Sequence, residues 1–497
     1  MMEQQTYILS IDQGTSGTKA IVFDQMGKMI MKATAPLKTI YRERGWVEQD
    51  SEDIYQNVLK AVRDCLGNFT KKGFDIKSII SCGISNQRET FIVWKKNGQP
   101  LYNALVWQCK RSVEICEKLK ERGIEPLIKD KTGLIIDPYF SGTKMIWLYE
   151  NDPNIKEAII SGEAYFGTVD TWLLFRLTGG QQYLTDYTNA SRTLFFNLNT
   201  LKWDQELLEE FGLHGLNLPK VQASSSDFGE TDFEGILDKK LSITAMIGDS
   251  HAAAFGEECF LPGTAKATLG TGCSVLMNTG QELKKSEHGM VSTICWSTEK
   301  RIDYALEGVI VTCGATVEWL KNELGIISSS EETESIALKL EDNGGVYLIP
   351  AFSGLGAPHW DMKRKAAIVG LSFDSNKNHI VRAALESIPY QIKDVISAME
   401  VDANLNLKEI NIDGGISSNN FVMGFLCNLL EKPVVHIDIT DVSALGACYL
   451  SGLKSGVYKD LKHLQSLQHK KVITPNVVLK SVVGEAYKKW RKAIKRE

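Results

Sequence analysis

The 497-residue sequence lacks several features that define specialised protein classes. It has no run of eighteen apolar residues, and no apolar stretch of the signal-peptide type precedes Tyr7, so we expect a cytoplasmic protein without membrane insertion. Its ten cysteines include no C-x-x-C pair and no histidines at zinc spacing, which predicts reduced, mostly buried thiols and no structural zinc. A net charge of −5 on so long a chain argues against a general nucleic-acid binder.

A turn rich in glycine and threonine joins two apolar segments near the N-terminus. The stretch Ile8–Lys19 predicts a buried strand that ends at Asp12, a turn with Gly14 and Gly17, and a second strand. Glycine lets backbone N–H groups approach a phosphate, and a carboxylate can hold Mg²⁺ that also binds phosphates. Neither the Walker pattern nor the dinucleotide-binding glycine pattern is present. The stretch indicates a metal–nucleotide site, although an ordinary hairpin turn would also fit it.

The same design recurs in the second half of the chain. Residues 263–277 again give a strand, a turn containing Gly270, Thr271 and Gly272, and another strand. The chain is long enough for two or three domains, and its 43% hydrophobic and 24% charged residues are ordinary for a globular protein. Two such turns suggest two related domains that each offer one phosphate-facing turn to a shared cleft.

Polar residues follow two apolar runs in the first half. Arg88 and Glu89 come after the predicted strand 79–85, where open α/β sheets bind ligands, so they are candidates to hydrogen-bond a polar substrate. A surface ion pair between them is the alternative. Trp107 ends another apolar run, where it fills the core or forms a flat wall for the C–H face of a carbohydrate.

Asp249 stands between a predicted apolar strand and a helix of small residues. An acid at this position can accept a proton from a bound hydroxyl, and it can equally cap the helix. We expect His251, which follows in the helix, to be packed or exposed and not catalytic. A double glycine, Gly414-Gly415, precedes the predicted helix 420–430, and this is our candidate for the adenosine and α-phosphate side.

The periodicity of apolar residues predicts further secondary-structure elements. We expect a strand at 193–197 and helices at 52–70 (capped by Asp50 or Ser51), 112–121, 142–150 (capped by Ser141), 168–179, 314–324 and 379–400.

Several motifs in order along the chain resemble the FGGY carbohydrate kinases, within the actin, hexokinase and Hsp70 ATPase superfamily. The resemblance runs from Tyr7 to about Val457 and is closest to the glycerol kinase branch. The motifs are Asp12-Gln13-Gly14-Thr15, Ser85-Asn86-Gln87-Arg88-Glu89-Thr90, Val106-Trp107-Gln108-Cys109, the segments 137–144 and 185–192, Gly270-Thr271-Gly272-Cys273, Ala357-Pro358-His359-Trp360-Asp361 and Asp413-Gly414-Gly415.

This resemblance implies an α/β fold of two RNase H-like domains facing a central cleft. The N-terminal domain would span residues 1–253 and bind the polyol, and the C-terminal domain would span 254–497 and bind the nucleotide. The implied reaction is ATP-dependent phosphorylation of a terminal hydroxyl of glycerol, with Mg²⁺ as the metal. The implied assembly is a homodimer or homotetramer.

The resemblance also implies roles for individual residues. Those that would contact the polyol are Arg88, Glu89, Trp107, Tyr139, Asp249, Ser250 and Ser274, with Asp249 as the catalytic base. Those that would hold Mg²⁺ are Asp12 and Asp249. Those that would bind ATP are Asp12, Thr15, Ser16, Gly17, Lys19 and Thr271 at the phosphates, and Gly314, Glu318, Gly415 and Asn419 in the ADP site.

Four residues depart from the glycerol kinase pattern. Ser250 replaces a usual glutamine and Ser274 a usual aromatic residue, which predicts a roomier and more polar pocket; Lys19 replaces an arginine and Glu318 a glutamine. Some relatives carry a phosphorylated histidine in the segment that corresponds to residues 231–234. This chain has no histidine there, so we do not expect regulation by histidine phosphorylation. The alternative function is therefore a kinase for a larger polyol or ketose, such as erythritol, threitol, xylulose or ribulose. A third alternative is an ATP-driven binding protein of the Hsp70 or actin type, or an inactive regulatory relative. We disfavour it, because we expect no chain left for an Hsp70-like peptide-binding domain and because Asp12, Arg88, Glu89 and Asp249 are retained.

Overall fold

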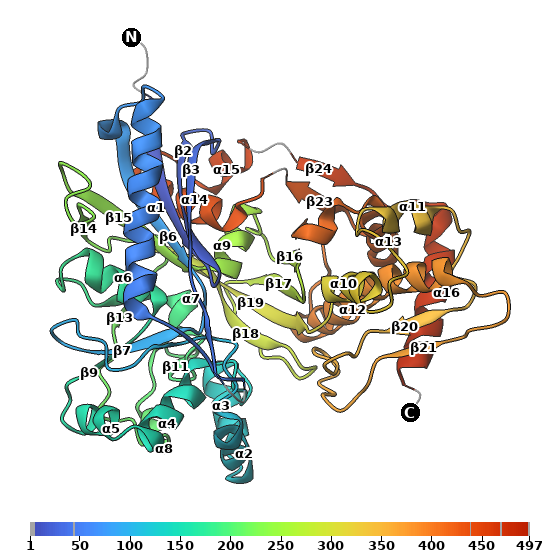
Figure 1. Ribbon diagram of the computed structural model, residues 1–497, viewed down its shortest axis with the longest axis horizontal. Coiled ribbons are helices and arrows are strands. Elements are labelled where there is room, and N and C mark those ends of the chain that lie inside the picture. The colour runs from blue at the N-terminus through green and yellow to red at the C-terminus, as the bar shows by residue number, and fades with distance from the viewer. Residues whose placement is uncertain (1–4, 43–44, 438, 468–469, 496–497) are drawn as a thin grey trace.

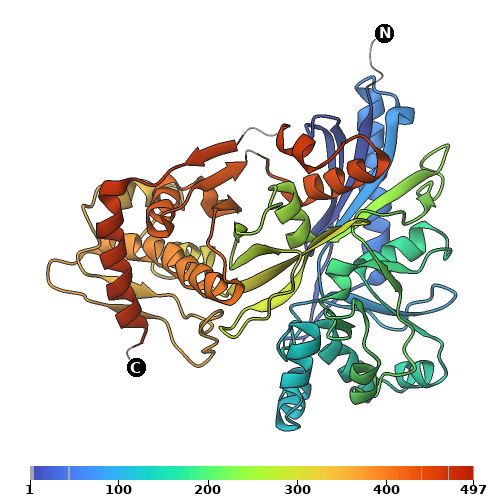
Figure 2. The same ribbon diagram turned by 180° about the vertical axis from the view of Figure 1, so that it is seen from behind.

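The chain forms two lobes that follow its order. In Figure 1 the blue-to-green first half makes one lobe, and the yellow-to-red second half makes most of the other. The view from behind shows the same division (Figure 2). This computed structural model describes residues 5–42, 45–437, 439–467 and 470–495.

The first lobe is built on a six-stranded sheet. Its strands are β1 (Tyr7–Gln13), β2 (Gly17–Asp24), β3 (Met29–Pro36), β6 (Ile79–Asn86), β14 (Glu230–Thr231) and β15 (Leu241–Gly248). Their order is β14-β15-β6-β1-β2-β3. β1, β2 and β3 form an antiparallel meander, whereas β6 lies parallel to β1 and β15 lies parallel to β6.

The second lobe repeats this arrangement. Its strands are β16 (Thr264–Leu269), β17 (Cys273–Gly280), β18 (Val291–Thr298), β19 (Arg301–Ile310), β22 (Glu409–Asp413), β23 (Val434–Ile437) and β24 (Lys470–Ile473), in the order β18-β19-β17-β16-β22-β23-β24. β16, β17 and β19 are the antiparallel meander, and β22 and β23 continue the sheet in parallel from β16. The predicted α/β class with two related domains is thereby confirmed.

One face of each sheet is covered by a long helix that starts at a side-chain cap. In α1 (Ser51–Lys71), Asp50 accepts hydrogen bonds from two backbone N–H groups of the first turn, so the predicted cap is confirmed, and the apolar side packs on β2 and β3. In α12 (Lys377–Ala403), Asn376 and His379 form a reciprocal capping box, and Asn404 ends the helix in the left-handed conformation.

The other face of the first sheet is covered by two helices from distant parts of the chain. α9 (Asp249–Gly256) follows β15 directly, and α14 (Val442–Ser455) returns from the second half to pack on α9, β1, β6 and β15. Figure 1 shows α14, in orange-red, beside the blue strands. A Cβ on Gly446 would lie 1.8 Å from the Ala252 carbonyl oxygen, so only glycine permits this approach. The two halves therefore share one layer.

The first lobe also carries an inserted region with its own core. Its five-stranded sheet has the order β4-β5-β8-β7-β9, formed by β4 (Ile40–Tyr41), β5 (Val47–Gln49), β7 (Phe91–Lys95), β8 (Ala104–Leu105) and β9 (Ala164–Thr168). The α-helices between α1 and α9 are α2 (Val113–Glu121), α3 (Glu125–Thr132), α4 (Ser141–Asn151), α5 (Pro153–Ile160), α6 (Val169–Leu177), α7 (Tyr187–Ala190) and α8 (Gln205–Glu210). Two short ribbons pair β10 (Leu184–Asp186) with β13 (Lys220–Gln222) and β11 (Phe196–Asn197) with β12 (Lys202–Trp203).

Two local predictions in this region are wrong. Ser141 does not cap α4, because it is the first residue of the helix and its hydroxyl donates instead to the Glu89 carbonyl at 2.8 Å. The predicted strand at 193–197 shrinks to β11, because Leu194 has a φ of 68°, which interrupts the extended backbone.

Smaller elements complete the second lobe. They are α10 (Gly314–Asn322), α11 (Glu332–Leu338), β20 (Tyr347–Ile349), β21 (Ala367–Val369), the 3₁₀ turn η3 (Gly415–Ser418), α13 (Asn420–Leu430), α15 (Leu461–Gln465) and α16 (Val477–Ile494). All ten cysteines are buried and free, as predicted. Within the described ranges, no helix combines the length and apolarity needed to cross a membrane.

Candidate functional site

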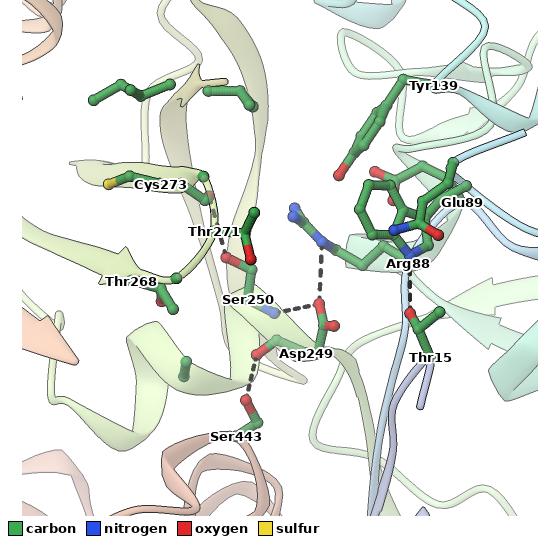
Figure 3. A pocket seen from close by; sticks show the side chains of 18 of the residues that line it. Thr15, Arg88, Glu89, Tyr139, Asp249, Ser250, Thr268, Thr271, Cys273 and Ser443 are labelled. Carbon is green, nitrogen blue, oxygen red and sulfur yellow. Dashed lines mark hydrogen bonds and ion pairs between the residues drawn. The ribbon is translucent and has the colours of Figure 1, made fainter. Parts of the chain in front are cut away.

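A cavity of about 800 Å³ lies between the lobes, where strands of both sheets end. It brings together nine of the predicted site residues: Thr15, Arg88, Glu89, Trp107, Tyr139, Asp249, Ser250, Thr271 and Ser274. Figure 3 shows Tyr139, Glu89 and Arg88 on one side, Thr268, Thr271 and Cys273 on the other, and Asp249 and Ser250 between them. The two sides belong to different lobes, so the cavity is the predicted shared cleft.

Arg88 and Asp249 reach the cleft from neighbouring parallel strands. Arg88 follows β6 and Asp249 follows β15, so both lie at carboxyl ends of the same sheet. Gly248 makes room for the arginine, since a Cβ there would lie 2.7 Å from the Arg88 Cγ. Glu89 has a φ of 57°, which turns the chain sharply after the strand. Both residues are buried, so the alternative of a surface ion pair is wrong.

Four buried charges form one network beneath the cleft. Arg88 pairs with Glu307 of β19 at 2.9 Å, and Arg192 pairs with Glu307 at 2.7 Å and with Glu89 at 2.5 Å. Burial alone would raise the pKa of Glu307, but the two guanidinium groups lower it below its ordinary value, so this carboxylate stays ionised. The network joins the two sheets and fixes Arg88 in place.

Asp249 projects from the first turn of α9 into the cleft. Its side chain is 39% exposed, and Oδ1 lies 3.3 Å from the Arg88 guanidinium. The backbone N–H of Ser250 donates to Oδ1 at 2.6 Å, while Gly248 occupies the cap position, so Asp249 is not the helix cap. The surrounding protein removes water and raises the pKa of Asp249, which Arg88 opposes. His251 is buried behind it, as expected of a packed residue, and contacts Thr293.

Two aromatic rings form one wall of the cleft. Trp107 and Tyr139 meet edge to face with centroids 5.6 Å apart, and the Trp107 indole N–H donates to the Thr15 hydroxyl at 2.9 Å. The loop that carries Tyr139 is held by Lys144, whose buried ammonium donates to the carbonyls of residues 138–140 at 2.6–2.9 Å. Burial lowers the pKa of Lys144 to about 8. The wall is therefore rigid and tied to the first glycine turn.

The two serines that depart from the family pattern lie together. The Ser250 and Ser274 hydroxyl oxygens are 3.5 Å apart, and the Ser274 hydroxyl donates to Glu307 at 3.0 Å. Both line the cavity. They extend the polar surface around Arg88 and Asp249 toward the second lobe.

Both glycine turns face the cleft. In the first, the Gly14 N–H donates to the Gly17 carbonyl at 2.9 Å. In the second, a Cβ on Gly272 would lie 2.8 Å from the Ile310 carbonyl oxygen, so the turn needs glycine there. Gly314, at the start of α10, donates its N–H to the Gly270 carbonyl at 2.8 Å, which places the predicted ADP helix against this turn.

Charged residues beside the first turn are already paired. Lys19 forms ion pairs with Asp12 at 3.4 Å and with Asp441 at 3.0 Å, and Lys32 pairs with the other oxygen of Asp441 at 2.8 Å. The Ser85 hydroxyl donates to Asp12 at 2.8 Å. The Ser443 hydroxyl, also from α14, donates to the Asp249 carbonyl at 3.0 Å. The N-terminal end of α14 thus touches both Lys19 and the backbone of Asp249.

The carboxylates in the cleft suit Mg²⁺ that arrives with a nucleotide. Asp12 and Asp249 are close enough for the charge of Asp12 to raise the pKa of Asp249. Within the part of the chain that the structure describes, no three acidic, histidine or cysteine side chains form a complete metal cage. Mg²⁺ commonly needs only one or two carboxylates besides phosphates and water, so this donor set fits it.

The other predicted nucleotide residues lie outside the cavity lining. Gly415 is in η3, and Asn419 caps α13 by accepting from the Val422 N–H. Glu318 lies on α10, where its carboxylate accepts from Asn322 at 3.2 Å. Ser16 and Gly17 belong to the first turn and the start of β2. Their roles toward ATP remain predictions, as do those of the other site residues.

Sequence reasoning missed five residues of this region. Arg192 ended a quoted motif without an assigned role, and Glu307 carried no local signal. The cavity is also lined by Lys266, Thr268 and Asp413, which stand beside the predicted turns in β16 and β22. The strand alternation of residues 265–269 is a signal that could have identified Lys266 and Thr268.

Comparison with known proteins supports the predicted family resemblance over the length of the chain. Residues 7–256 match the N-terminal domain, and residues 265–454 the C-terminal domain, of the FGGY family of carbohydrate kinases. The chain is 44% identical over 496 residues to a glycerol kinase of Desulforamulus reducens, covering 100% of this chain and 98% of that protein. It is 45% identical over 493 residues to glycerol kinase 2 of Thermotoga maritima, covering 99% and 98%. A crystal structure of Plasmodium falciparum glycerol kinase with ADP superposes with a TM-score of 0.94 at 34% identity, covering 99% and 98% of the two chains.

Proposed function

The chain belongs to the FGGY family of carbohydrate kinases, and on that premise we propose that it transfers the terminal phosphoryl group of ATP to a terminal hydroxyl of glycerol. The product is glycerol 3-phosphate. The observation that carries the proposal is the position of Asp249, between Arg88, the aromatic wall and Thr15 of the first glycine turn on one side and Thr271 of the second turn on the other.

The first lobe binds the polyol. Arg88 and Glu89 present charged hydrogen-bonding groups, and the Tyr139 phenol adds another. Trp107 packs on the carbon skeleton, as an indole face does with C–H groups. Because the buried network already holds Arg88 in place, little side-chain entropy is lost when the substrate binds.

Asp249 acts as the general base. Its carboxylate accepts the proton of the terminal hydroxyl as the oxygen attacks the phosphorus, and a positioned base of this kind contributes about 10²–10⁴-fold. Arg88, 3.3 Å away, keeps the carboxylate available in its charged form against the effect of burial.

The nucleotide binds between the turns. Thr15, Ser16, Gly17, Lys19 and Thr271 face the phosphates, and Gly314, Glu318, Gly415 and Asn419 line the ADP site. Asp12 and Asp249 would hold Mg²⁺, which supplies charge neutralisation to the phosphates when bound. Positioning and charge stabilisation are the main requirements of phosphoryl transfer.

A coupled assay of ADP release tests the proposal. Purified protein with Mg-ATP should give its highest kcat/KM with glycerol, in a panel that includes erythritol, threitol, ribitol, xylitol, dihydroxyacetone, xylulose and ribulose. ADP release that no polyol stimulates would refute the proposal.

A larger polyol or ketose is the second candidate, and Ser250 with Ser274 favours it. Two hydroxyls at the cavity wall can bind additional substrate hydroxyls, whereas an apolar wall discriminates one methylene by only about 1–3 kcal/mol. A clearly higher kcat/KM for a four- or five-carbon substrate in the same assay would select this candidate.

The resemblance further supports a cytoplasmic homodimer or homotetramer with domains over 1–253 and 254–497. Sedimentation velocity tests the assembly. Limited proteolysis tests the division, with a first cut near the exposed Leu261, between α9 and β16, as the supporting result.

A further inference from the structure

Lys266 is a buried cation that lines the cleft. Lys266 as a whole is 1% exposed to solvent, and its side-chain ammonium donates a hydrogen bond to the Thr268 hydroxyl at 2.5 Å. Among the described residues, no carboxylate forms an ion pair with it. A buried lysine is rarely left without a negative partner, because an uncompensated charge in the protein interior costs several kcal/mol.

The sheet geometry directs this side chain into the cleft. Ala265, Ala267 and Leu269 point into the apolar core of the second lobe, so the alternating residues Lys266 and Thr268 face the opposite side of β16. That side holds α9 and the cavity. Lys266 therefore lies on the strand that leads directly into the second glycine turn.

The neighbouring acids make no ion pair with Lys266. Glu257, after α9, is buried, and burial and Asp413 raise its pKa well above the ordinary value, while Lys266 and Lys470 act in the opposite direction. Asp413 lines the cavity but makes no ion pair with Lys266. An anionic ligand in the cavity would supply the direct ion-pair partner that Lys266 lacks.

We propose that Lys266 binds the phosphate chain of ATP, donating from its ammonium to a phosphoryl oxygen held between the two turns. The proposal rests on the ATP-dependent function above. Of the substrate groups that the cleft would hold, the polyol and the adenosine are neutral, so only the phosphates supply the counter-charge. Beside the first turn, by contrast, Lys19 is already paired with Asp12 and Asp441, and Lys32 of β3 shares Asp441.

The test is the Lys266→Met variant, compared with Lys131→Met, which removes a lysine that is paired with Asp204 and Glu206 and does not line the cavity. Thermal unfolding is measured alone and with Mg-ATP, Mg-ADP, AMP or glycerol. We expect Lys266→Met to unfold at a temperature no lower than wild type without nucleotide, because a buried unpaired charge is removed. Its Kd for Mg-ATP should rise roughly 10- to 100-fold, as for a charge-assisted hydrogen bond, with AMP and glycerol binding unchanged.

The opposite result would overturn the proposal. If Lys266→Met lowers the unfolding temperature and leaves the Kd for Mg-ATP unchanged, the lysine is structural. If that variant does not fold, Thr268→Val removes the hydroxyl that orients the ammonium, and an unchanged Kd for Mg-ATP would equally refute the role. Binding needs no turnover, so a wild-type protein that binds Mg-ATP but fails to phosphorylate glycerol would refute the proposed function alone.

Discussion

The two glycine turns face one cleft, but the lysines beside them differ in their electrostatic state. Lys19, at the first turn, is 35% exposed and pairs with Asp12 and Asp441. Lys266, before the second turn, is 1% exposed and has a hydroxyl, Thr268, as its hydrogen-bond partner. The two sheets share a similar strand order, but Lys19 stands in β2 after its turn and Lys266 in β16 before its turn, so the two cations enter the cleft from different strands of the repeated design.

This difference shows that the two repeated halves of the fold present different electrostatic environments to their ligands. The polyol side of the cleft has its charges matched before any ligand arrives, both at Lys19 and in the network that joins Arg88 and Arg192 to Glu307 of the second lobe. Matched charges keep a rigid site for an uncharged polyol. The second lobe keeps a positive charge that only an anionic ligand satisfies, which suits a nucleotide.

The largest effect should come from Asp249→Asn, which removes the base between the turns and leaves both turns intact. We expect kcat to fall about 10²–10⁴-fold, with the nucleotide-induced rise in unfolding temperature retained. Steady-state kinetics and thermal shift measure the two quantities. Asp402→Asn, at a carboxylate that pairs with His288, is the control. Activity within tenfold of wild type would show that Asp249 is not the base.

The matched charges between the lobes are broken by Glu307→Gln. Arg88 and Arg192 would remain buried without their shared carboxylate, so the free energy of unfolding should fall by about 3–5 kcal/mol. Urea denaturation measures it. Glu282→Gln, which removes a surface ion pair with Lys284, should cost less than about 1 kcal/mol. Equal losses in the two variants would contradict the distinction between buried and exposed pairs.

A double-mutant cycle of Lys19→Met and Asp441→Asn measures how strongly the ion pair at the first turn contributes to Mg-ATP binding. If Asp441 acts by holding Lys19 near the phosphates, the double variant should bind Mg-ATP no worse than Lys19→Met, with a coupling of about 0.5–3 kcal/mol. Isothermal titration calorimetry gives the affinities, and the exposed pair Lys60 and Asp64 is the control. Additive losses would mean that the two residues act independently.

The smallest effect concerns pH. Burial lowers the pKa of Lys144 to about 8 in the folded protein, whereas an unfolded lysine titrates near pH 10. Between these values the unfolded chain binds more protons, so this group should make the protein more stable as pH rises from about 8 to about 10. Denaturation at several pH values checks this against Lys144→Met, which should lack the increase.

Local features of this site were predictable, and long-range ones were not. The glycine turns and the strand-end residues Arg88 and Asp249 were found because backbone demands and strand ends leave a pattern within a few residues. Glu307 was missed because its partner Arg88 is 219 positions away and meets it only when the lobes pack. The prediction that Ser141 caps its helix was wrong for a similar reason, because its hydroxyl donates to the carbonyl of Glu89, which is distant in the sequence and close only in the fold.

The close contact between Gly446 and Ala252 also determines when the first lobe can complete its folding during synthesis. On this face of the first sheet, α9 is synthesised with the first half, but α14 comes only from residues 442–455, so the layer stays incomplete until most of the chain has left the ribosome. A fragment that ends near residue 253 would present that apolar face to water and invite aggregation. The two lobes are consequently made one after the other but completed together.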